Sequence, residues 1–166
     1  MAGVASLPAS PVDGQLKIQW VPVIVDPTAP KLTEINATGS VDMSCYFTTW
    51  TETGTQATVP DDRICSRQVF EQPGKETRTL SVMYIENPTA PTLNLAATTL
   101  AKNTTGFFVE RRGVPFENAF AIGDLVDVWP VKTGLQVPTW AAGQTGKMAQ
   151  KLFVTGAVIA RVACVA

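Results

Sequence analysis

Carboxylates and thiols are the side chains of this chain with the most obvious capacity for chemistry, because its 166 residues include no histidine. Serine and cysteine hydrolases normally use a histidine base, and zinc sites usually recruit histidine or closely spaced cysteines. The sequence also lacks the G-x-S-x-G, G-x-x-x-x-G-K-[ST] and G-x-G-x-x-G patterns of nucleophile elbows and phosphate-binding loops. Carboxylate chemistry is what remains open.

Two acidic pairs are the candidates for such chemistry. Asp124 and Asp127 lie three residues apart in a strand-like run, where alternation places their side chains on opposite faces of a sheet. Asp61 and Asp62 follow Pro60 in a predicted loop, where neighbouring carboxylates are usually solvated. Neither pair predicts a shared proton or metal, so we expect no catalytic residue, cofactor or metal.

The cysteines and the one basic doublet favour structural roles. Cys45, Cys65 and Cys164 cannot all pair within one chain, and we expect buried thiols, with a contact between Cys45 and Cys65 left open. Arg111 and Arg112 are adjacent in a predicted strand. We expect both at the surface, on opposite faces, pairing with carboxylates rather than with phosphates.

Length and composition indicate a single globular domain over residues 1–166. The hydrophobic fraction is 45% and the formal net charge is -1, which gives no general attraction for nucleic acid. The first 14 residues lack the pattern of a signal peptide, and no apolar run approaches the roughly 20 residues needed to span a bilayer. We therefore expect synthesis in a cytoplasm, no membrane contact, and a flexible arm at 1–14.

Period-two alternation dominates the chain and predicts a mainly β fold. Even-numbered residues from Leu152 to Cys164 form an apolar face, while the odd-numbered face is mixed. Both faces are largely apolar from Leu125 to Val131, as expected for a sandwich that also packs against other subunits. The predicted strands cover about 16–25, 43–48, 64–70, 77–86, 105–112, 124–133 and 148–164, with a helix at 91–101, a weaker helical turn at 31–37, and long loops at 49–62 and 135–146.

Four strings in a fixed order carry a resemblance to a known family: DDRICS at 61–66, FEQPG at 70–74, VDVWP at 126–130 and QKLFVTG at 150–156. Over about residues 28–165, the chain resembles the major tail tube proteins of long-tailed (siphovirus-type) bacteriophages, particularly those of actinobacterial hosts. The resemblance implies a β-sandwich or barrel with one flanking helix and long inter-ring loops. It also implies that six subunits close into a ring, and that rings stack into a hollow tube that conducts double-stranded DNA.

The resemblance further implies partners and a location. The partners would be other copies of the chain, a tape-measure protein, a tail terminator and baseplate or distal tail proteins, with double-stranded DNA as passing cargo. The protein would be part of the virion tail and assembled in the host cytoplasm, with loop 49–62 contacting adjacent subunits or rings. The candidate interface residues are Trp50, Asp61, Asp62, Arg63, Trp140, Lys151, Phe153 and Arg161.

Short hydroxyl side chains mark a candidate lumen face. Thr77, Thr79 and Ser81 share one side of a predicted strand, which is either an ordinary solvent-facing surface or a wall along which a polyanion slides without being held. Alternative functions are a tail terminator, the tube of a related contractile injection device, or a small-ligand-binding β-barrel. Assembly behaviour distinguishes these alternatives.

Overall fold

Antiparallel strands build most of the structure, a computed structural model that describes residues 11–166. The predicted mainly β fold with a small flanking helix is confirmed. In chain order the elements are β1 (Leu16–Val21), α1 (Leu32–Ile35), β2 (Val41–Asp42), β3 (Phe47–Asp61), β4 (Phe70–Ile85), a 3₁₀ turn (Pro91–Leu93), α2 (Leu95–Thr99), β5 (Thr105–Arg112), β6 (Leu125–Thr139), β7 (Lys147–Val154) and β8 (Ile159–Ala163).

The strands form one sheet in the order β2-β1-β5-β6-β7-β4-β3, and β8 pairs with β6. Strand β6 joins its two halves, since the first part of β6 pairs with β5 and the second with β7. The register shifts between Thr133 and Gln136. A Cβ on Gly134 would lie 2.5 Å from the carbonyl oxygen of Lys151, so this close approach of β6 and β7 requires glycine.

The main core lies where the two halves of the sheet face each other. Trp50 of β3 meets Phe108 of β5 edge to face at 5.2 Å between ring centroids, and Trp20 of β1 meets the same ring at 5.1 Å. Each large apolar side chain buried in this way contributes about 1.5–3 kcal/mol. The buried members include Ile18, Met43, Leu80, Val82, Tyr84, Leu100, Trp129, Val131 and Leu152.

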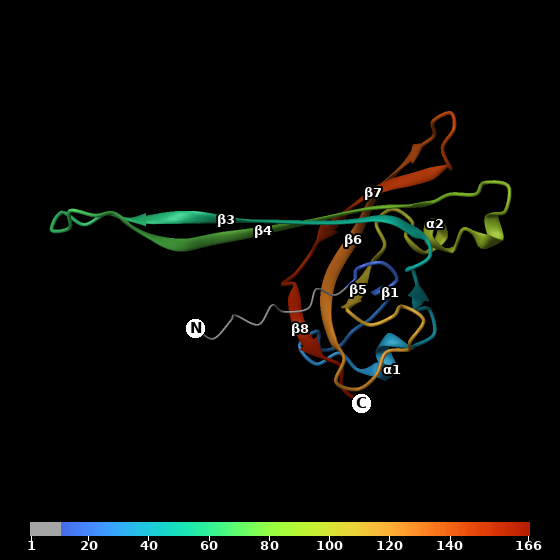
Figure 1. The fold of residues 1–166 in the computed structure, drawn as a ribbon, viewed down its shortest axis with the longest axis horizontal. Helices are drawn as coiled ribbons and strands as arrows, with labels where there is room; N and C mark the ends of the chain where they lie inside the picture. Colours follow the sequence, from blue (N-terminus) through green and yellow to red (C-terminus); the bar gives the residue numbers. More distant parts are fainter. Residues whose placement is uncertain (1–10) are drawn as a thin grey trace, which may run out of the picture.

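A long hairpin projects from this body and is the main departure from expectation (Figure 1). The predicted loop at 49–62 is wrong, because these residues lie mostly in β3, which pairs with β4 from Phe47 to Asp61. The predicted strand at 64–70 is also wrong, because all but its last residue lie in the turn between β3 and β4. We call residues 54–78 the arm. Backbone hydrogen bonds between its two strands and its β-favouring threonines support an extended form without a core.

Other boundaries also differ. Strand β6 runs on to Thr139 where a loop from 135 was expected, because its second half pairs with β7. The single strand expected at 148–164 is two, β7 and β8. The helix expected at 91–101 is confirmed in place but is interrupted at Asn94. The side chain of Asn94 bonds the backbone N–H and C=O of Asn87, both at 2.8 Å, and so ties this position to the preceding turn.

The beginning of the described chain is attached to the body. The backbone N–H of Phe116 donates to the carbonyl oxygen of Gly14 at 2.9 Å, and that of Gly113 donates to Gln15 at 2.9 Å. Most of the flexible N-terminal segment predicted at 1–14 lies outside the described residues. The helical turn predicted at 31–37 is confirmed as α1.

Candidate assembly surfaces

The tip of the arm exposes apolar side chains. Ile64 is fully exposed, and Phe70 is 53% exposed at the start of β4. Beside them, Arg63 binds Asp61 through two hydrogen bonds of 3.0 and 2.9 Å, while Asp62 is exposed. Three of the predicted interface residues therefore gather at the tip, and an apolar patch that nothing in the described chain covers lies with them. Such patches often mark protein contacts.

The predicted lumen and interface residues meet on one face of the sheet. Thr77, Thr79 and Ser81 are all exposed, and Ser81 pairs across the strands with Lys151 of β7. Alternation then places Phe153 on the same face as Lys151, with the lysine ammonium 5.2 Å from the phenylalanine ring centroid. Sequence reasoning assigned these residues two separate roles, whereas the register makes them neighbours.

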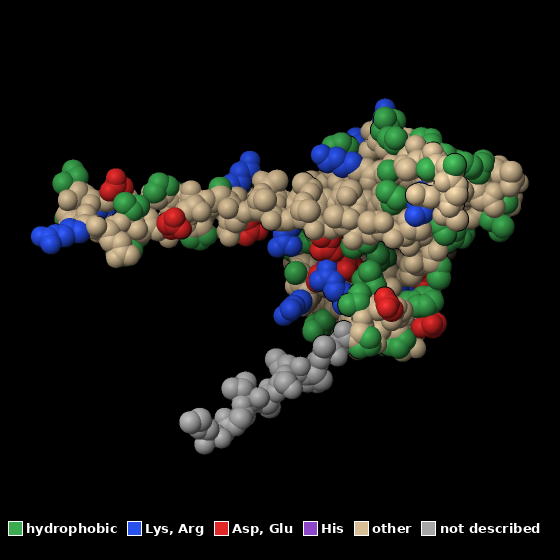
Figure 2. Space-filling view, turned by 45° about the horizontal axis from the view of Figure 1, so that its top comes forward, with side chains coloured by type: hydrophobic (Ala, Val, Ile, Leu, Met, Phe, Trp, Pro, Cys, Tyr) green, Lys and Arg blue, Asp and Glu red, His purple; other side chains and the backbone are tan. Residues whose placement is uncertain are grey.

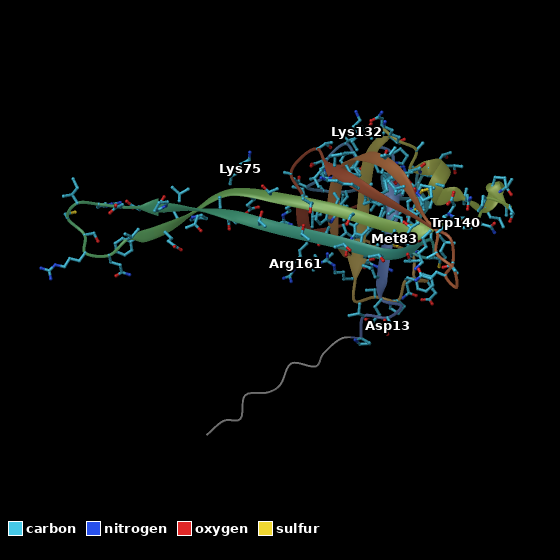
Figure 3. The ribbon with its side chains drawn as sticks, turned by 90° about the horizontal axis from the view of Figure 1, so that it is seen from above. Asp13, Lys75, Met83, Lys132, Trp140 and Arg161 are labelled. Atoms are coloured by element: carbon cyan, nitrogen blue, oxygen red, sulfur yellow. The ribbon has the colours of Figure 1, made fainter. Side chains whose placement is uncertain are left out.

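This face has two chemically different parts. The half formed by β3 and β4 carries hydroxyl side chains, such as Thr53, which hydrogen-bonds Thr79 across the strands. A depression of about 470 Å³ extends from these strands over β7 and β6, where Leu135, Val137 and Phe153 line it. The basic side chains of this face are Lys132, Lys147 and Lys151. No carboxylate lies on the same face of the paired segments of β6 and β7. Figure 3 views the molecule from above and labels Met83 over the β3–β4 ribbon and Lys132 at the edge of the body.

A charge cluster lies on the opposite face, where the arm leaves the body. Arg112 of β5 reaches Glu52 of β3 at 2.9 Å, Glu110 at 2.6 Å and Asp127 of β6 at 3.2 Å. The indole N–H of Trp50 also donates to Glu52 at 2.6 Å. Figure 2 shows acidic and basic side chains gathered below the start of the arm. One guanidinium therefore links three strands and fixes the base of the arm against β5.

The cluster holds more carboxylates than its arginine can neutralise. Burial raises the pKa of Glu110 to about 8, and the adjacent Glu52 carboxyl adds to this effect while Arg112 opposes it. Burial also disfavours ionised Glu52, but hydrogen bonds from Glu110 and Trp50, together with Arg112, hold the pKa of Glu52 below its ordinary value. Of the two carboxyl groups, Glu110 is therefore the one whose pKa is raised, chiefly by burial.

The raised pKa of Glu110 predicts that the protein loses stability as the pH rises from about 4.5 to 8. The ordinary glutamate value is 4.5, so between about pH 4.5 and 8 the folded chain holds a proton that the unfolded chain has released, and the free energy of unfolding falls as pH rises. No histidine titrates in this window. Glu110→Gln should remove this decline in denaturant unfolding measured from pH 5.5 to 8.5, whereas the exposed Glu71→Gln should preserve it. An unchanged slope in Glu110→Gln would contradict the assignment.

The two arginines of the doublet have different environments. They lie on opposite faces and pair with carboxylates, as predicted, but the expectation that both lie at the surface is wrong. Arg111 is 1% exposed and binds Asp124 at 2.7 Å, with further bonds to the carbonyl oxygens of Pro115, Asn118 and Ala119. Asp124 and Asp127 serve different arginines, as alternation required.

Three predicted interface residues make contacts within their own chain. Trp50 packs against the core rings and binds Glu52. Trp140 is 59% exposed, although its indole N–H donates to Glu86 at 3.0 Å. The backbone N–H of Arg161 donates to Asp127 at 2.7 Å, which leaves its side chain exposed. Their roles between subunits stay predictions.

The thiols also differ from expectation. Only Cys164 is buried; Cys45 and Cys65 are exposed. Cys45 and Cys65 also lie near opposite ends of β3, about 50 Å apart for a 15-residue strand, which excludes their contact.

Sequence reasoning missed an amide network formed by Gln136 and Gln150. Their side-chain amides donate to the carbonyl oxygen of Leu100 at 3.2 and 2.9 Å and hold the end of α2 on the sheet.

Two other kinds of site are absent from the described residues. Within residues 11–166, no three His, Cys, Asp or Glu side chains are grouped so that they could hold a metal ion. The same part of the chain contains no helix with the length and apolar character required to cross a membrane.

Two solved structures are similar to the chain. The chain is similar to the tail of an empty GTA particle computed with C6 symmetry, with a TM-score of 0.47 and 9% identity over 75% of this chain and 90% of that one. It is also similar to the six-fold symmetrised baseplate of the anti-feeding prophage (AFP), with a TM-score of 0.49 and 9% identity over 93% and 97%.

Sequence comparison is more decisive. No curated protein matches the chain in sequence. A sequence model of the phage tail tube protein family, however, matches residues 4–166. The chain therefore belongs to the phage tail tube protein family, whose members are structural components of the virion tail rather than enzymes.

Proposed function

We propose that six copies of this chain close into a ring, and that rings stack into the tube of a long, siphovirus-type tail that conducts double-stranded DNA. Six is the number implied by the sequence resemblance. Assembly would take place in the host cytoplasm, with a tape-measure protein, a terminator and baseplate or distal tail proteins as further partners. The observation that carries the proposal is a sheet with two unpaired edges that can join.

The two edges belong to β3 and to the second half of β6. In the described chain, β3 pairs only with β4, and residues 134–139 of β6 pair only with β7. The strands β6, β7, β4 and β3 are successively antiparallel, so β6 runs opposite to β3. Rotation about a ring axis keeps these directions, and β6 of the next copy would extend the sheet as an antiparallel neighbour of β3. Such pairing leaves no open edge after closure.

The β3 edge has register shifts at Thr48 and Ala57 but few of the other devices that protect an exposed strand. Its 15 residues include no lysine or arginine, and its only proline, Pro60, is next to the tip. A long edge without such protection pairs readily with other chains. A second copy of the chain supplies the cover in this proposal.

The arm gives a route from one ring to the next. Its paired strands leave the body in one direction (Figure 1), and its tip presents Ile64 and Phe70 without cover from the described chain. Burial of these side chains on a copy in an adjacent ring would stabilise stacking. Head-to-tail contacts of this kind repeat until another protein stops them.

The hydroxyl-bearing face of the sheet is the proposed wall of the lumen. Thr77, Thr79 and Ser81 offer short neutral groups that do not bind phosphates strongly. Lys132 and Lys151 share the face over β6 and β7, so attraction for DNA is expected there at low salt and should weaken as salt rises.

Electron microscopy combined with hydrogen exchange tests the proposal. The purified chain should form stacked rings at high concentration, and amide exchange should slow in β3 and in residues 134–139 on assembly, because the open edges become hydrogen-bonded. Single rings that never stack would favour a tail terminator. A monomer at every concentration that fails to enter tails, or edges that exchange equally fast in tubes, would contradict the proposed ring.

A further inference from the structure

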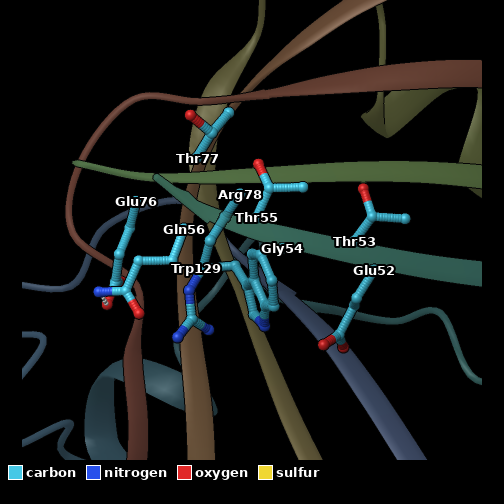
Figure 4. Close-up of a pocket in the computed structure, with 9 residues that line it drawn as sticks. All are labelled: Glu52, Thr53, Gly54, Thr55, Gln56, Glu76, Thr77, Arg78 and Trp129. Carbon is cyan, nitrogen blue, oxygen red and sulfur yellow. Dashed lines mark hydrogen bonds between the residues drawn. The ribbon is translucent and has the colours of Figure 1, made fainter. Parts of the chain in front are cut away.

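The underside of the arm base is a polar groove with unmatched charge. A depression of about 400 Å³ lies there, lined by Glu52, Glu76, Arg78 and Trp129, among others (Figure 4). Within the described residues, the side chain of Glu76 accepts one long hydrogen bond, from the Gln56 amide at 3.4 Å, and forms no ion pair. Trp129 is buried, and its indole N–H has no hydrogen-bond partner in the described chain. An indole donor cannot pair with an ammonium group, so the Glu76 carboxylate is the group that a cationic occupant would meet.

The charges around the groove favour a cation. Glu52 lines it directly and connects through Arg112 to Glu110 and Asp127. With Glu76 and Arg78, the region holds four carboxyl groups and two guanidinium groups. Even with Glu110 protonated, one negative charge lacks a positive partner. An ammonium group from another copy would neutralise it.

The proposed ring brings a specific segment to this groove. The turn at 101–104 lies against β6 at Thr133, where the backbone N–H of Asn103 donates to the carbonyl oxygen of Thr133 at 3.0 Å. The start of the turn is on the core-facing side, where the Thr133 hydroxyl donates to the carbonyl oxygen of Ala101 at 2.6 Å. Cross-strand pairing puts Thr133, Leu152, Leu80 and Glu52 on one face of the sheet. When β6 of the next copy adds to β3, its 101–104 turn therefore lies over the face of β3 that carries Glu52.

Lys102 is the basic side chain of that turn. It is exposed, and no ion pair of Lys102 is found among the described residues. We propose that Lys102 of the next copy enters the groove beside β3 of the first copy and pairs with Glu76, so that each ring contains one such contact at every subunit boundary. This inference rests on the proposed ring, and it names the side chains that fix how neighbouring copies meet.

A charge exchange tests the contact. Lys102→Glu and Glu76→Lys should each raise the protein concentration required for tube formation by about tenfold, the change expected for losing about 1.4 kcal/mol at an interface. The double variant should return to within about threefold of the original chain. All three variants should keep the melting temperature of the monomer, because both side chains are exposed.

Lys75→Glu provides the matched control. It adds the same charge change next to Glu76, but neighbouring side chains of a strand point to opposite faces, so tube formation should change little. If Lys102→Glu forms tubes as readily as the original chain, or if the double variant is no better than the single variants, the proposed contact is wrong. If the original chain forms no rings at all, the proposed function fails instead.

Discussion

A chain in which residues 57–75 are replaced by Asn-Gly should keep its fold and form no tubes. Gln56 and Glu76 face each other across the two strands, so a two-residue turn can join them in the existing register. The change removes the exposed Ile64 and Phe70 but no member of either buried core cluster. Electron microscopy at concentrations where the full chain polymerises would show the loss, and thermal unfolding would show an intact body.

The shortened arm also separates contacts within a ring from contacts between rings. The strand edge from Phe47 to Gln56 remains, so single rings should still form if ring closure uses β3 near the body. A milder variant, Ile64→Ser with Phe70→Ser, keeps the full arm and removes only apolar surface from its tip. It should raise the concentration needed for stacking without affecting the monomer. Tubes of normal length from the shortened chain would show that the arm has no part in assembly.

Sequence patterns did not predict the paired strands of the arm, for a physical reason. Period-two alternation reports the burial of one strand face, and the arm has solvent on both faces, so residues 49–62 read as a threonine-rich loop. The same reasoning explains why the predicted strand ends at 133 whereas β6 continues to Thr139. Leu135 and Val137 are exposed although this part of β6 pairs with β7. Strand β5 is buried on both faces between Phe108 and Arg111, and the sequence predicted it with its correct ends.

Register is the second kind of information that the sequence did not contain. Alternation correctly separated Asp124 from Asp127 and Arg111 from Arg112, but it could not say which carboxylate meets which guanidinium. Pairing of Glu110 with Asp127 across β5 and β6 brings the acids of one face to Arg112. The charge cluster, the buried Arg111 site and the adjacency of Ser81 to Lys151 all depend on such pairings.

Arg111→Met should cause the largest loss of stability of any single charge removal in the chain, about 3–5 kcal/mol. The guanidinium is 1% exposed and satisfies Asp124 together with three backbone carbonyl oxygens, while its plane lies 4.9 Å from the ring centroid of Phe120. Methionine fills a similar volume but donates no hydrogen bond, so the carboxylate and the carbonyl groups lose their partners. Denaturant unfolding of the monomer measures the change.

Two further variants identify the cause of that loss. Arg63→Met removes an ion pair whose arginine side chain is 66% exposed, and should cost less than about 1 kcal/mol. Arg111→Met combined with Asp124→Asn removes the uncompensated charge, so it should recover part of the stability lost in Arg111→Met. The carbonyl groups of Pro115, Asn118 and Ala119 stay without their donor, so recovery should be incomplete. A double variant no more stable than Arg111→Met would mean that the bonds to the 115–119 segment, rather than the buried ion pair, hold this end of the sheet together.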